Sequence, residues 1–274
     1  MTTTTLQHAH LFRSLHDARR PLALSTVWDV ASALVAQEAG APALATTSAG
    51  GAWSRGFADG DRVDRSEALA VLAAVVAAVD VPVSADVEGG YATDAEGVAE
   101  TVRAVLDAGA VGINIEDGPR SPDETARRVA AARRAADESG VPLFVNARCD
   151  VYLSGEVEPG LRLAETLRRA ARYVDAGADG IFVPGVVDLP TVAVLADALS
   201  VPLNVMVGPG APTVSDLAQV GVARVSLGSA VAQSAYTVVQ NATAELVTSG
   251  TYGALAGALD YGTVDGLLLS AGTR

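Results

Sequence analysis

The sequence of 274 residues contains no lysine, because all 19 of its basic residues are arginine. This excludes mechanisms that need a lysine Schiff base, including those of lysine-bound pyridoxal cofactors. Only three histidines are present, and they are His8, His10 and His16 near the amino terminus. A histidine general base or a Ser-His-Asp triad deep in the fold is therefore not expected. Acid and base chemistry falls to carboxylates, Tyr, Ser, Thr or the single cysteine.

Other absences limit the partners and the location. Cys149 is the only cysteine, so no intrachain disulfide and no Cys-rich metal site is expected. The formal net charge is −13, and no basic patch with interleaved aromatics offers a nucleic-acid surface. The apolar stretch 68–79 is too short to span a bilayer and predicts a core-facing helix. Residues 1–5 are polar and lack a signal-peptide pattern, so we expect a cytoplasmic protein with no membrane partner.

Two kinds of apolar segment alternate along the chain. Segments of the first kind begin with Val-Pro or, once, Arg-Pro, and proline is tolerated at the first residue of a strand. They cover residues 20–25, 81–86, 141–146 and 201–206. Segments of the second kind open with a small-residue turn and cover residues 39–46, 108–115, 176–183 and 220–226. The strict alternation predicts eight strands.

Patterns of helical period lie between these strands, for example at 93–107, 122–138 and 161–175, and Thr93 is a candidate N-cap of the first. Eight alternating strands and helices predict an α/β fold of one (β/α)8 TIM barrel domain over residues 1–274. No Gly-x-Gly-x-x-Gly follows a strand, which argues against a dinucleotide fold.

The carboxyl-terminal region 229–274 is expected to form extra helices beyond the barrel, at 230–247 and 252–269. Two interpretations stay open for them. They either cap the barrel or contact another subunit of a homo-oligomer.

Polar residues gather at the carboxyl ends of the expected strands, which is where such barrels hold their active sites. They are Thr46, Thr47, Ser48, Asp86, Glu88, Glu116, Asp117, Asn146, Arg148, Asn204 and Ser226. Solvated side chains placed at random would not all lie at the carboxyl ends of the strands, so the pattern favours a functional cluster.

Asp86 and Glu88 stand two residues apart where an apolar strand meets a glycine turn. Residues i and i+2 of a strand face the same side, so both carboxylates are expected to converge on a metal ion. Two solvated carboxylates at the rim are the alternative. Carboxylates without His or Cys ligands select a hard cation, so Mg²⁺ is expected, with Mn²⁺ as a substitute and zinc disfavoured.

Arg148 follows Asn146 by two residues, and its planar guanidinium suits a substrate carboxylate or phosphonate. The alternative for Arg148 is a salt bridge to Glu116 or Asp117. Cys149 then points to the opposite face and is interpreted as a small core residue rather than a nucleophile.

Residues on the loops after the second strand offer further groups. Thr47 and Ser48, followed by a small-residue turn, offer hydroxyl and N–H donors to an anionic oxygen. Asp59 is interpreted as a residue near the metal rather than a direct ligand, and a solvated loop aspartate is the alternative.

Several segments together resemble the isocitrate lyase / phosphoenolpyruvate mutase superfamily over nearly the whole chain. They cover residues 28–33, 46–50, 86–91, 112–117, 146–148, 176–184, 202–206 and 224–228. The resemblance implies a Mg²⁺-dependent barrel that binds a small 2-oxo or 2-hydroxy acid and makes or breaks a C–C or P–C bond beside it. It also implies a homotetramer, or a dimer, that exchanges its last helices.

The resemblance implies roles for individual residues at the metal. Asp86 binds the ion directly, and Glu88 and Glu116 do so directly or through waters. Asp59 lies near the metal waters. Arg148 grips the substrate.

It also implies the substrate contacts around the metal. Thr47 binds the substrate, and the N–H groups of Ser48 and Ala49 contact its carboxylate. Trp28 and Asp29 line the base of the pocket. Asn204, on the seventh strand, is a further candidate substrate-binding residue. The candidate catalytic residues are Arg148, Asp59, Glu116 and Tyr91.

The chain departs from the superfamily in one loop. Isocitrate and methylisocitrate lyases carry a Lys-x-Cys-Gly-His stretch after the fourth strand, and the mutases and phosphonopyruvate hydrolases carry a Lys-Thr-Asn-Ser-like stretch there. Residues 118–124 read Gly-Pro-Arg-Ser-Pro-Asp-Glu and match neither. Arg55 and Arg120 are candidates to replace the lost groups.

Three hypotheses follow. The leading one is a lyase or hydrolase that cleaves a C–C bond in a small di- or tricarboxylate through an enolate-like intermediate, with Tyr91 or a metal-bound water transferring the proton. The second is P–C bond chemistry of the phosphoenolpyruvate mutase or carboxyphosphonate mutase type. The third is a 2-oxo-acid binding protein with little catalysis.

Overall fold

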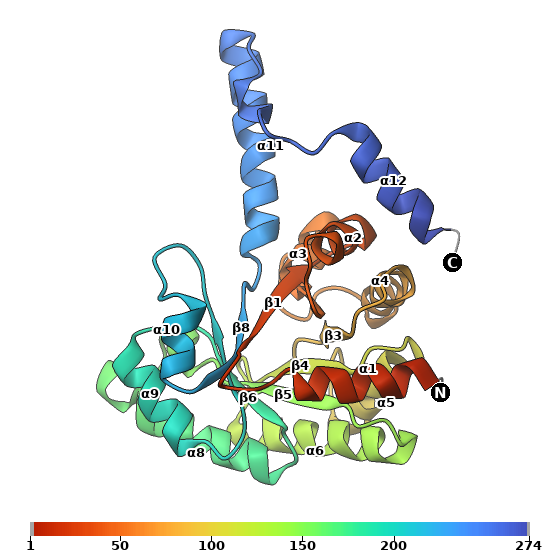
Figure 1. Cartoon of the computed structure of the whole chain (residues 1–274). Helices are drawn as coiled ribbons and strands as arrows, with labels where there is room; N and C mark the ends of the chain where they lie inside the picture. The colour runs from red at the N-terminus through yellow and green to blue at the C-terminus, as the bar shows by residue number, and fades with distance from the viewer. Residues whose placement is uncertain (1–2, 273–274) are drawn as a thin grey trace.

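Eight parallel strands form a closed barrel in the computed structural model, which describes residues 3–272 (Figure 1). Each strand pairs with the next, and β1 pairs with β8 to close the ring. The strands are β1 (Leu22–Val27), β2 (Leu44–Thr46), β3 (Val83–Asp86), β4 (Gly112–Glu116), β5 (Phe144–Arg148), β6 (Gly180–Val183), β7 (Leu203–Met206) and β8 (Val222–Ser226). The predicted (β/α)8 barrel and all eight predicted strands are confirmed.

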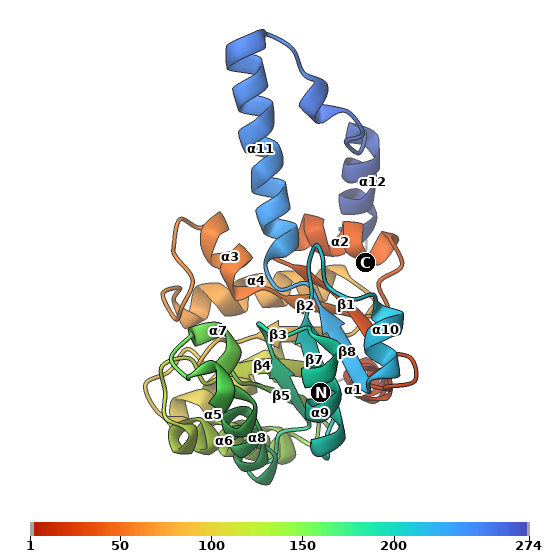
Figure 2. The same cartoon turned by 90° about the vertical axis from the view of Figure 1, so that its left-hand side faces the viewer.

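Helices surround this barrel and cover its outer face (Figures 1 and 2). They are α1 (Thr3–Ser14), α2 (Val30–Glu38), α3 (Ser48–Ser54), α4 (Arg65–Ala78), α5 (Ala95–Asp107), α6 (Pro122–Ser139), α7 (Val151–Ser154), α8 (Arg162–Asp175), α9 (Leu189–Ala198) and α10 (Val214–Gln219), with a 3-10 turn η1 (Pro159–Leu161). Among residues 3–272, no helix is long and apolar enough to cross a membrane.

Helix starts follow local capping chemistry. Ser121 caps α6, where its hydroxyl accepts a hydrogen bond from the N–H of Glu124, and Pro122 occupies the first turn. The predicted N-cap of α5 is wrong by one position. Asp94, rather than Thr93, accepts the N–H of Gly97, because a carboxylate one residue later reaches the same orphan donors.

Helix α1 closes the amino-terminal end of the barrel. Phe12 is fully buried, and a side chain at Gly112, the first residue of β4, would collide with its ring. The His16 ring stacks on Phe144, the first residue of β5, with 3.8 Å between ring centroids. The bottom of the barrel is therefore filled, and the carboxyl ends of the strands remain as the face for chemistry.

A buried polar layer crosses the middle of the barrel. Asn146 Nδ2 donates to Asn114 Oδ1 at 2.8 Å and to Asn204 Oδ1 at 3.1 Å, and Arg224 Nη2 donates to Asn114 Oδ1 at 3.1 Å. Burial lowers the pKa of Arg224 to about 9, and the negative charge of Asp86 opposes that shift. Asn114 and Asn146 each lie two residues before a rim residue, Glu116 and Arg148, so this layer forms the floor under the rim.

The carboxyl-terminal helices leave the barrel. Helix α11 (Ala230–Ser249) projects away from it, and α12 (Tyr261–Ala271) returns toward α2 (Figure 2). The second helix, predicted at 252–269, is present but begins later than expected, at Tyr261. A 3-10 turn η2 (Gly253–Leu255) is followed by a break in which Gly257 has φ +84°, and Asp260 starts α12 as its N-cap.

Candidate active site at the carboxyl end of the barrel

Asp86 is the last residue of β3, and its neighbours on β2 and α3 hold it in place. Its backbone N–H donates to Thr46 Oγ1 at 2.9 Å, and its Oδ2 accepts the backbone N–H of Ser48 at 3.0 Å. Asp86 therefore uses its Oδ2 to accept a hydrogen bond from the protein, and its Oδ1 remains available at the rim.

Glu88 lies beyond the end of β3, so the strand argument for its orientation is wrong. The strand stops at Asp86, and Glu88 adopts φ +49° in the following turn. Its side chain is nevertheless buried, and its Oε2 accepts the backbone N–H of Asp61, while Oε1 is buried without a partner within residues 3–272. Burial raises the pKa of Glu88 to about 7, the Asp61 N–H opposes the shift, and the Asp86 carboxylate adds to it.

Glu116 and Arg148 end β4 and β5 and are direct partners in the strand register. Arg148 Nη1 lies 2.6 Å from Glu116 Oε2, and Arg148 Nε lies 2.6 Å from Asp150 Oδ1. The salt-bridge alternative for Arg148 is thus realised with Glu116, although not with Asp117. Burial raises the pKa of Glu116 to about 8, Arg148 opposes this, and the charge of Asp86 adds to it.

The donor chemistry of this rim suits a hard divalent cation. The charge of Asp86 raises the pKa of both Glu88 and Glu116, and one buried Glu88 oxygen has no hydrogen-bond partner within residues 3–272. In the part of the chain described, no group of three or more His, Cys, Asp or Glu side chains is placed so that it could hold a metal ion by itself. A site with few protein ligands is the kind that Mg²⁺ uses, because that ion keeps several waters.

Tyr91 and Asp59 both reach this carboxylate group. The pKa of the Tyr91 hydroxyl is raised above the ordinary value by burial and by the charges of Glu88 and Asp86. Asp59 is exposed, but its carboxyl hydrogen-bonds the Ser48 side chain. Partial burial and Asp86 raise the pKa of Asp59. Its place beside the metal waters stays a prediction.

A small cavity of about 40 Å³ adjoins Asp86 on the side of β1 and β2. Its lining includes three residues predicted to lie in the substrate pocket, namely Trp28, Thr47 and Ser48. Thr47 also caps α3, its Oγ1 lying 3.5 Å from the N–H of Gly50, and Ala49 is buried in the same turn. Their contacts with substrate remain predictions.

Asp29 has a local structural use. Its carboxylate accepts the Ser32 N–H at 2.7 Å and caps α2, and the residue is exposed. The Asp29 side chain is therefore committed to the helix end, and the cavity next to Trp28 does not include it.

The structure does not bring Asn204 to the rim. It is the second residue of β7 and 1% exposed, and it lies in the polar floor of the barrel. Its Nδ2 donates to the Val205 and Arg224 carbonyls and to Ser226 Oγ, and its Oδ1 accepts from Asn146. The donor and acceptor atoms of the amide are therefore all hydrogen-bonded inside the barrel. Asn204 does not reach the rim because a strand residue two positions before the end lies one layer deeper.

Cys149 is fully buried, and burial raises the pKa of its thiol well above the ordinary value. A thiol in that state is a weak nucleophile. The interpretation of Cys149 as a core residue is confirmed.

The comparisons with known proteins bear on this rim. The family model of phosphoenolpyruvate phosphomutase matches residues 12–247. The chain belongs to the phosphoenolpyruvate mutase family. The match includes the whole barrel, and it confirms the superfamily resemblance.

Relatives of this phosphoenolpyruvate mutase family member include proteins from three organisms. An uncharacterized protein of Mycobacterium tuberculosis is 39% identical over 80% of this chain and 81% of its own. The 2-methylisocitrate lyase of Escherichia coli is 31% identical over 70% of this chain and 67% of its own. The structure of a candidate phosphonomutase from Burkholderia cenocepacia superposes with a TM-score of 0.83, with 43% identity, 87% of this chain covered and 99% of the other. The chain is therefore an enzyme of a superfamily of lyases and mutases.

Sequence reasoning missed two acidic residues of the site. Asp150 is buried and accepts a hydrogen bond from the Nε of Arg148. Its position two residues after Arg148 is the sequence signal that could have identified it. Asp61 contacts Glu88 through its backbone and Arg120 through its side chain. Asp61 lies in an exposed loop without strand or helix, so no periodic pattern marked it.

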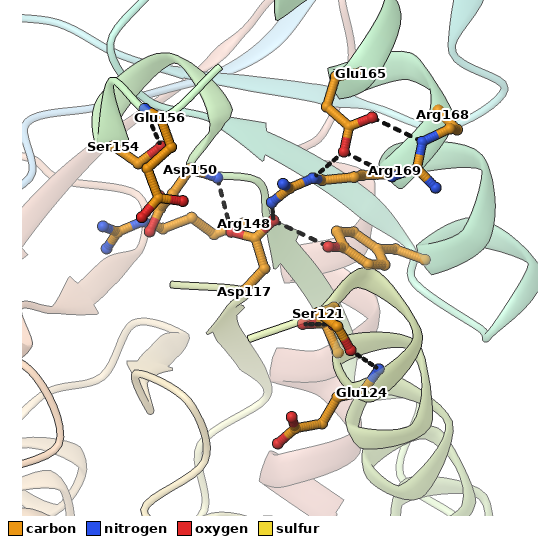
Figure 3. A network of polar contacts seen from close by, with 12 residues as sticks. Asp117, Ser121, Glu124, Arg148, Asp150, Ser154, Glu156, Glu165, Arg168 and Arg169 are labelled. Atoms are coloured by element: carbon orange, nitrogen blue, oxygen red, sulfur yellow. Dashed lines mark hydrogen bonds and ion pairs between the residues drawn. The ribbon is translucent and has the colours of Figure 1, made fainter. Parts of the chain in front are cut away.

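Asp117 belongs to a polar network that also contains Asp150 and Arg148 (Figure 3). Its fully buried carboxylate accepts from Arg169 Nη1 at 2.8 Å, from Tyr173 Oη at 3.0 Å and from the backbone N–H of Asp150 at 2.9 Å. This network ties α8 to the strand end that carries Arg148. Asp117 therefore supports the position of Asp150 and takes no part in the rim itself.

Proposed function

We propose that this family member is a Mg²⁺-dependent lyase or hydrolase that cleaves a C–C bond in a small 2-hydroxy or 2-oxo di- or tricarboxylate. The single observation that carries the proposal is the Glu116–Arg148 pair at the rim, with Asp86 on the adjoining strand. A guanidinium that binds carboxylates stands beside carboxylates that suit a metal ion.

Arg148 would bind the carboxylate of the substrate. Its fork already holds two separate carboxylates, Glu116 and Asp150, at 2.6 Å each. A substrate carboxylate that takes the place of Glu116 would leave Glu116 free to face the metal. Asp150 would keep the guanidinium oriented during this exchange, because it binds the Nε.

Asp86, Glu88 and Glu116 would hold Mg²⁺ directly or through waters. When bound, the ion would stabilise negative charge that develops on the 2-oxygen of the substrate as the bond beyond C3 breaks. Tyr91 would hold a proton at its hydroxyl near this charge, since burial and the neighbouring carboxylates keep it protonated at neutral pH. The Ser48 N–H would keep Asp86 oriented.

Carbon-13 NMR of the enzyme with a panel of small 2-hydroxy and 2-oxo di- and tricarboxylates tests the proposal. We expect Mg²⁺-dependent release of pyruvate, glyoxylate or oxalate from at least one acid, with the reaction stopped by EDTA. The absence of turnover over the whole panel with Mg²⁺ present would remove the proposal.

A second candidate function is P–C bond chemistry of the phosphoenolpyruvate mutase or carboxyphosphonate mutase type. The matching family model and the Burkholderia relative favour it. Phosphorus NMR with phosphonopyruvate separates the candidates. Only P–C chemistry converts the phosphonate signal to a phosphate or phosphate-ester signal, and an unchanged signal with active C–C cleavage leaves the first proposal standing.

We also propose that the enzyme is a cytoplasmic homo-oligomer, a tetramer or a dimer, assembled through residues 229–274. Apolar side chains on α11 and α12 are exposed, including Val239, Val247 and Leu269. Burial of this apolar surface in a contact between subunits would lower the free energy of the assembly. Light scattering coupled to size exclusion chromatography tests this, and a monomer at micromolar concentration would contradict it.

A further inference from the structure

Arg120 lies on the loop between β4 and α6, and its guanidinium reaches the carboxylate rim. Its Nη2 forms an ion pair with Asp61, and the Arg120 side chain is 15% exposed. The guanidinium rests directly on the backbone of Gly89, because a Cβ added at Gly89 would lie 2.1 Å from Arg120 Cζ. Only glycine at position 89 allows this approach.

Arg120 and Glu116 also face one another across Gly118. A Cβ added at Gly118 would lie 3.6 Å from Arg120 Nη1 and 3.7 Å from Glu116 Oε1. Arg148 binds the other oxygen of that carboxylate, Glu116 Oε2. Two guanidinium groups therefore lie near Glu116, and one of them, that of Arg148, is ion-paired with it.

The turn under Arg120 is held by a different arginine. Arg128 is 3% exposed, and its guanidinium donates to the carbonyls of Gly89, Ala92 and Thr93 at 2.8 to 2.9 Å. The turn consequently keeps its shape without Arg120. Within residues 3–272 the carboxylate that pairs with Arg120 is that of Asp61, which lies on an exposed loop.

We propose that Arg120 is a specificity-determining residue that binds a second anionic group of the substrate, a distal carboxylate or phosphonate, in exchange for Asp61. The inference rests on the proposed function, in which Arg148 and the metal carboxylates bind the 2-oxo or 2-hydroxy end. A small acid held at that end extends its far end past Glu116 toward Arg120. Exchange of one carboxylate for another leaves the guanidinium paired, so the ion pair with Asp61 is replaced rather than lost.

Paired ligands that differ only in the distal group test this by calorimetry in Mg²⁺. Lactate and malate differ by a carboxylate, and pyruvate and phosphonopyruvate differ by a phosphonate. In the unaltered enzyme we expect at least one distal group to tighten the Kd about tenfold or more, as a charged hydrogen-bonded pair does. The pair that shows the gain tells which anionic group the site takes.

Arg120→Gln is expected to reduce that gain below threefold and to leave the Kd of lactate and pyruvate within threefold. Arg65→Gln is the matched control, because Arg65 is an exposed arginine in the same outer groove, paired with Glu100 at 3.1 Å. It is expected to keep the full gain. Equal weakening of all four ligands by Arg120→Gln would mean a purely structural ion pair and would overturn the inference.

Asp61→Asn provides a second readout that does not remove the guanidinium. The near-isosteric amide keeps an oxygen for the Gly89 N–H, which Asp61 Oδ1 accepts at 3.3 Å, and removes the competing charge. We expect the ligands with a distal group to bind more tightly and the others to be unchanged, whereas a structural role predicts weaker binding of every ligand. No binding of any ligand by the unaltered enzyme would contradict the proposed function as well, while binding of lactate and pyruvate without a distal gain would overturn this inference alone.

Discussion

Arg148 Nη1 lies 2.6 Å from Glu116 Oε2, and the two residues are paired in the register of β5 and β4. Arg148, which we expect to bind the substrate carboxylate, is thus paired with Glu116, which we expect to face the metal ion. A cation near Glu116 competes with Arg148 for that carboxylate and releases the guanidinium. We infer that the metal and the acid assist each other's binding, and this coupling is reciprocal.

Arg148→Lys is expected to weaken oxalate binding in saturating Mg²⁺ by roughly 10- to 100-fold, because an ammonium lacks the planar fork. The affinity for Mg²⁺ alone should change by less than about threefold. Calorimetry measures both constants. Asp150→Asn is the companion variant, since it keeps Arg148 and removes the charge at its Nε, so we expect a smaller loss. Oxalate binding by Arg148→Lys at the unaltered affinity would contradict the assigned role.

The affinity for Mg²⁺ should rise with pH. The pKa values of Glu88 and Glu116 are raised to about 7 and about 8 in the metal-free protein, so both carboxyls carry protons below those values. Metal ligands must lose their protons, and binding at pH 6 to 7 therefore releases protons and is weaker than at pH 8.5. Calorimetry in two buffers of different ionisation enthalpy counts the protons released.

A matched pair of variants checks the origin of that pH dependence. Asp86→Asn should abolish Mg²⁺ binding at every pH while keeping the Ser48 N–H bond through its amide oxygen. Asp137→Asn changes an exposed carboxylate on α6 and should leave binding unchanged. An affinity for Mg²⁺ that is flat from pH 6 to 8.5 would show that the two glutamates do not bind the ion.

Loss of the buried Asp117 carboxylate should destabilise the fold. Asp117→Ala removes the buried acceptor of Arg169 Nη1 and of the Tyr173 hydroxyl, while Glu165 still pairs with Arg169 Nε, and we expect a loss of about 3 to 5 kcal/mol in the free energy of unfolding. Tyr173→Phe removes one hydrogen bond and should cost about 1 kcal/mol. Urea denaturation followed by circular dichroism measures both. A cost for Asp117→Ala no larger than that for Tyr173→Phe would be inconsistent with the network in Figure 3.

His16 should make the protein less stable in mild acid. Its pKa is lowered to about 3 in the fold by burial and by the charge of Arg224, against an ordinary value of 6.5. The unfolded chain therefore binds a proton between pH 6.5 and 3 that the folded chain does not, so this stability is complete above pH 6.5 and is lost as the pH falls. The slope is at most about 1.4 kcal/mol per pH unit.

Two variants isolate the histidine. The free energy of unfolding of His16→Gln, measured from pH 7 to 4.5, should fall less steeply than that of the unaltered protein. His10→Gln alters an exposed histidine of the same helix and should keep the original slope. Equal slopes for all three proteins would refute the titration assigned to His16.

The fold could be predicted from the sequence because each strand carries its own start signal and each signal recurs. Val-Pro and Ala-Gly-Ala segments mark the strand starts, and β3 and β6 end at the expected residues, Asp86 and Val183. The start predicted for the last helix, residue 252, was wrong because Glu245 of α11 accepts the N–H groups of Gly253 and Ala254, a tertiary contact that no local pattern contains.

The site was predicted in part for a similar reason. Asp86, Glu116 and Arg148 end strands, so the barrel brings them to one rim, whereas Asn204 lies one layer too deep and is bound by the barrel. Glu88 reaches the rim through a turn with positive φ, and Asp61 through an irregular loop. Backbone conformations of that kind have no periodic signature in a single sequence.

The most direct test of the central claim is a crystal structure of the enzyme with Mg²⁺ and oxalate. The account predicts the ion about 2.1 Å from an Asp86 oxygen, which is the usual Mg–O distance, with oxalate bound to both the ion and Arg148. It also predicts that Arg148 has moved from Glu116 while keeping Asp150. An ion bound away from Asp86, or an Arg148 still paired with Glu116 and without contact to the ligand, would contradict the account.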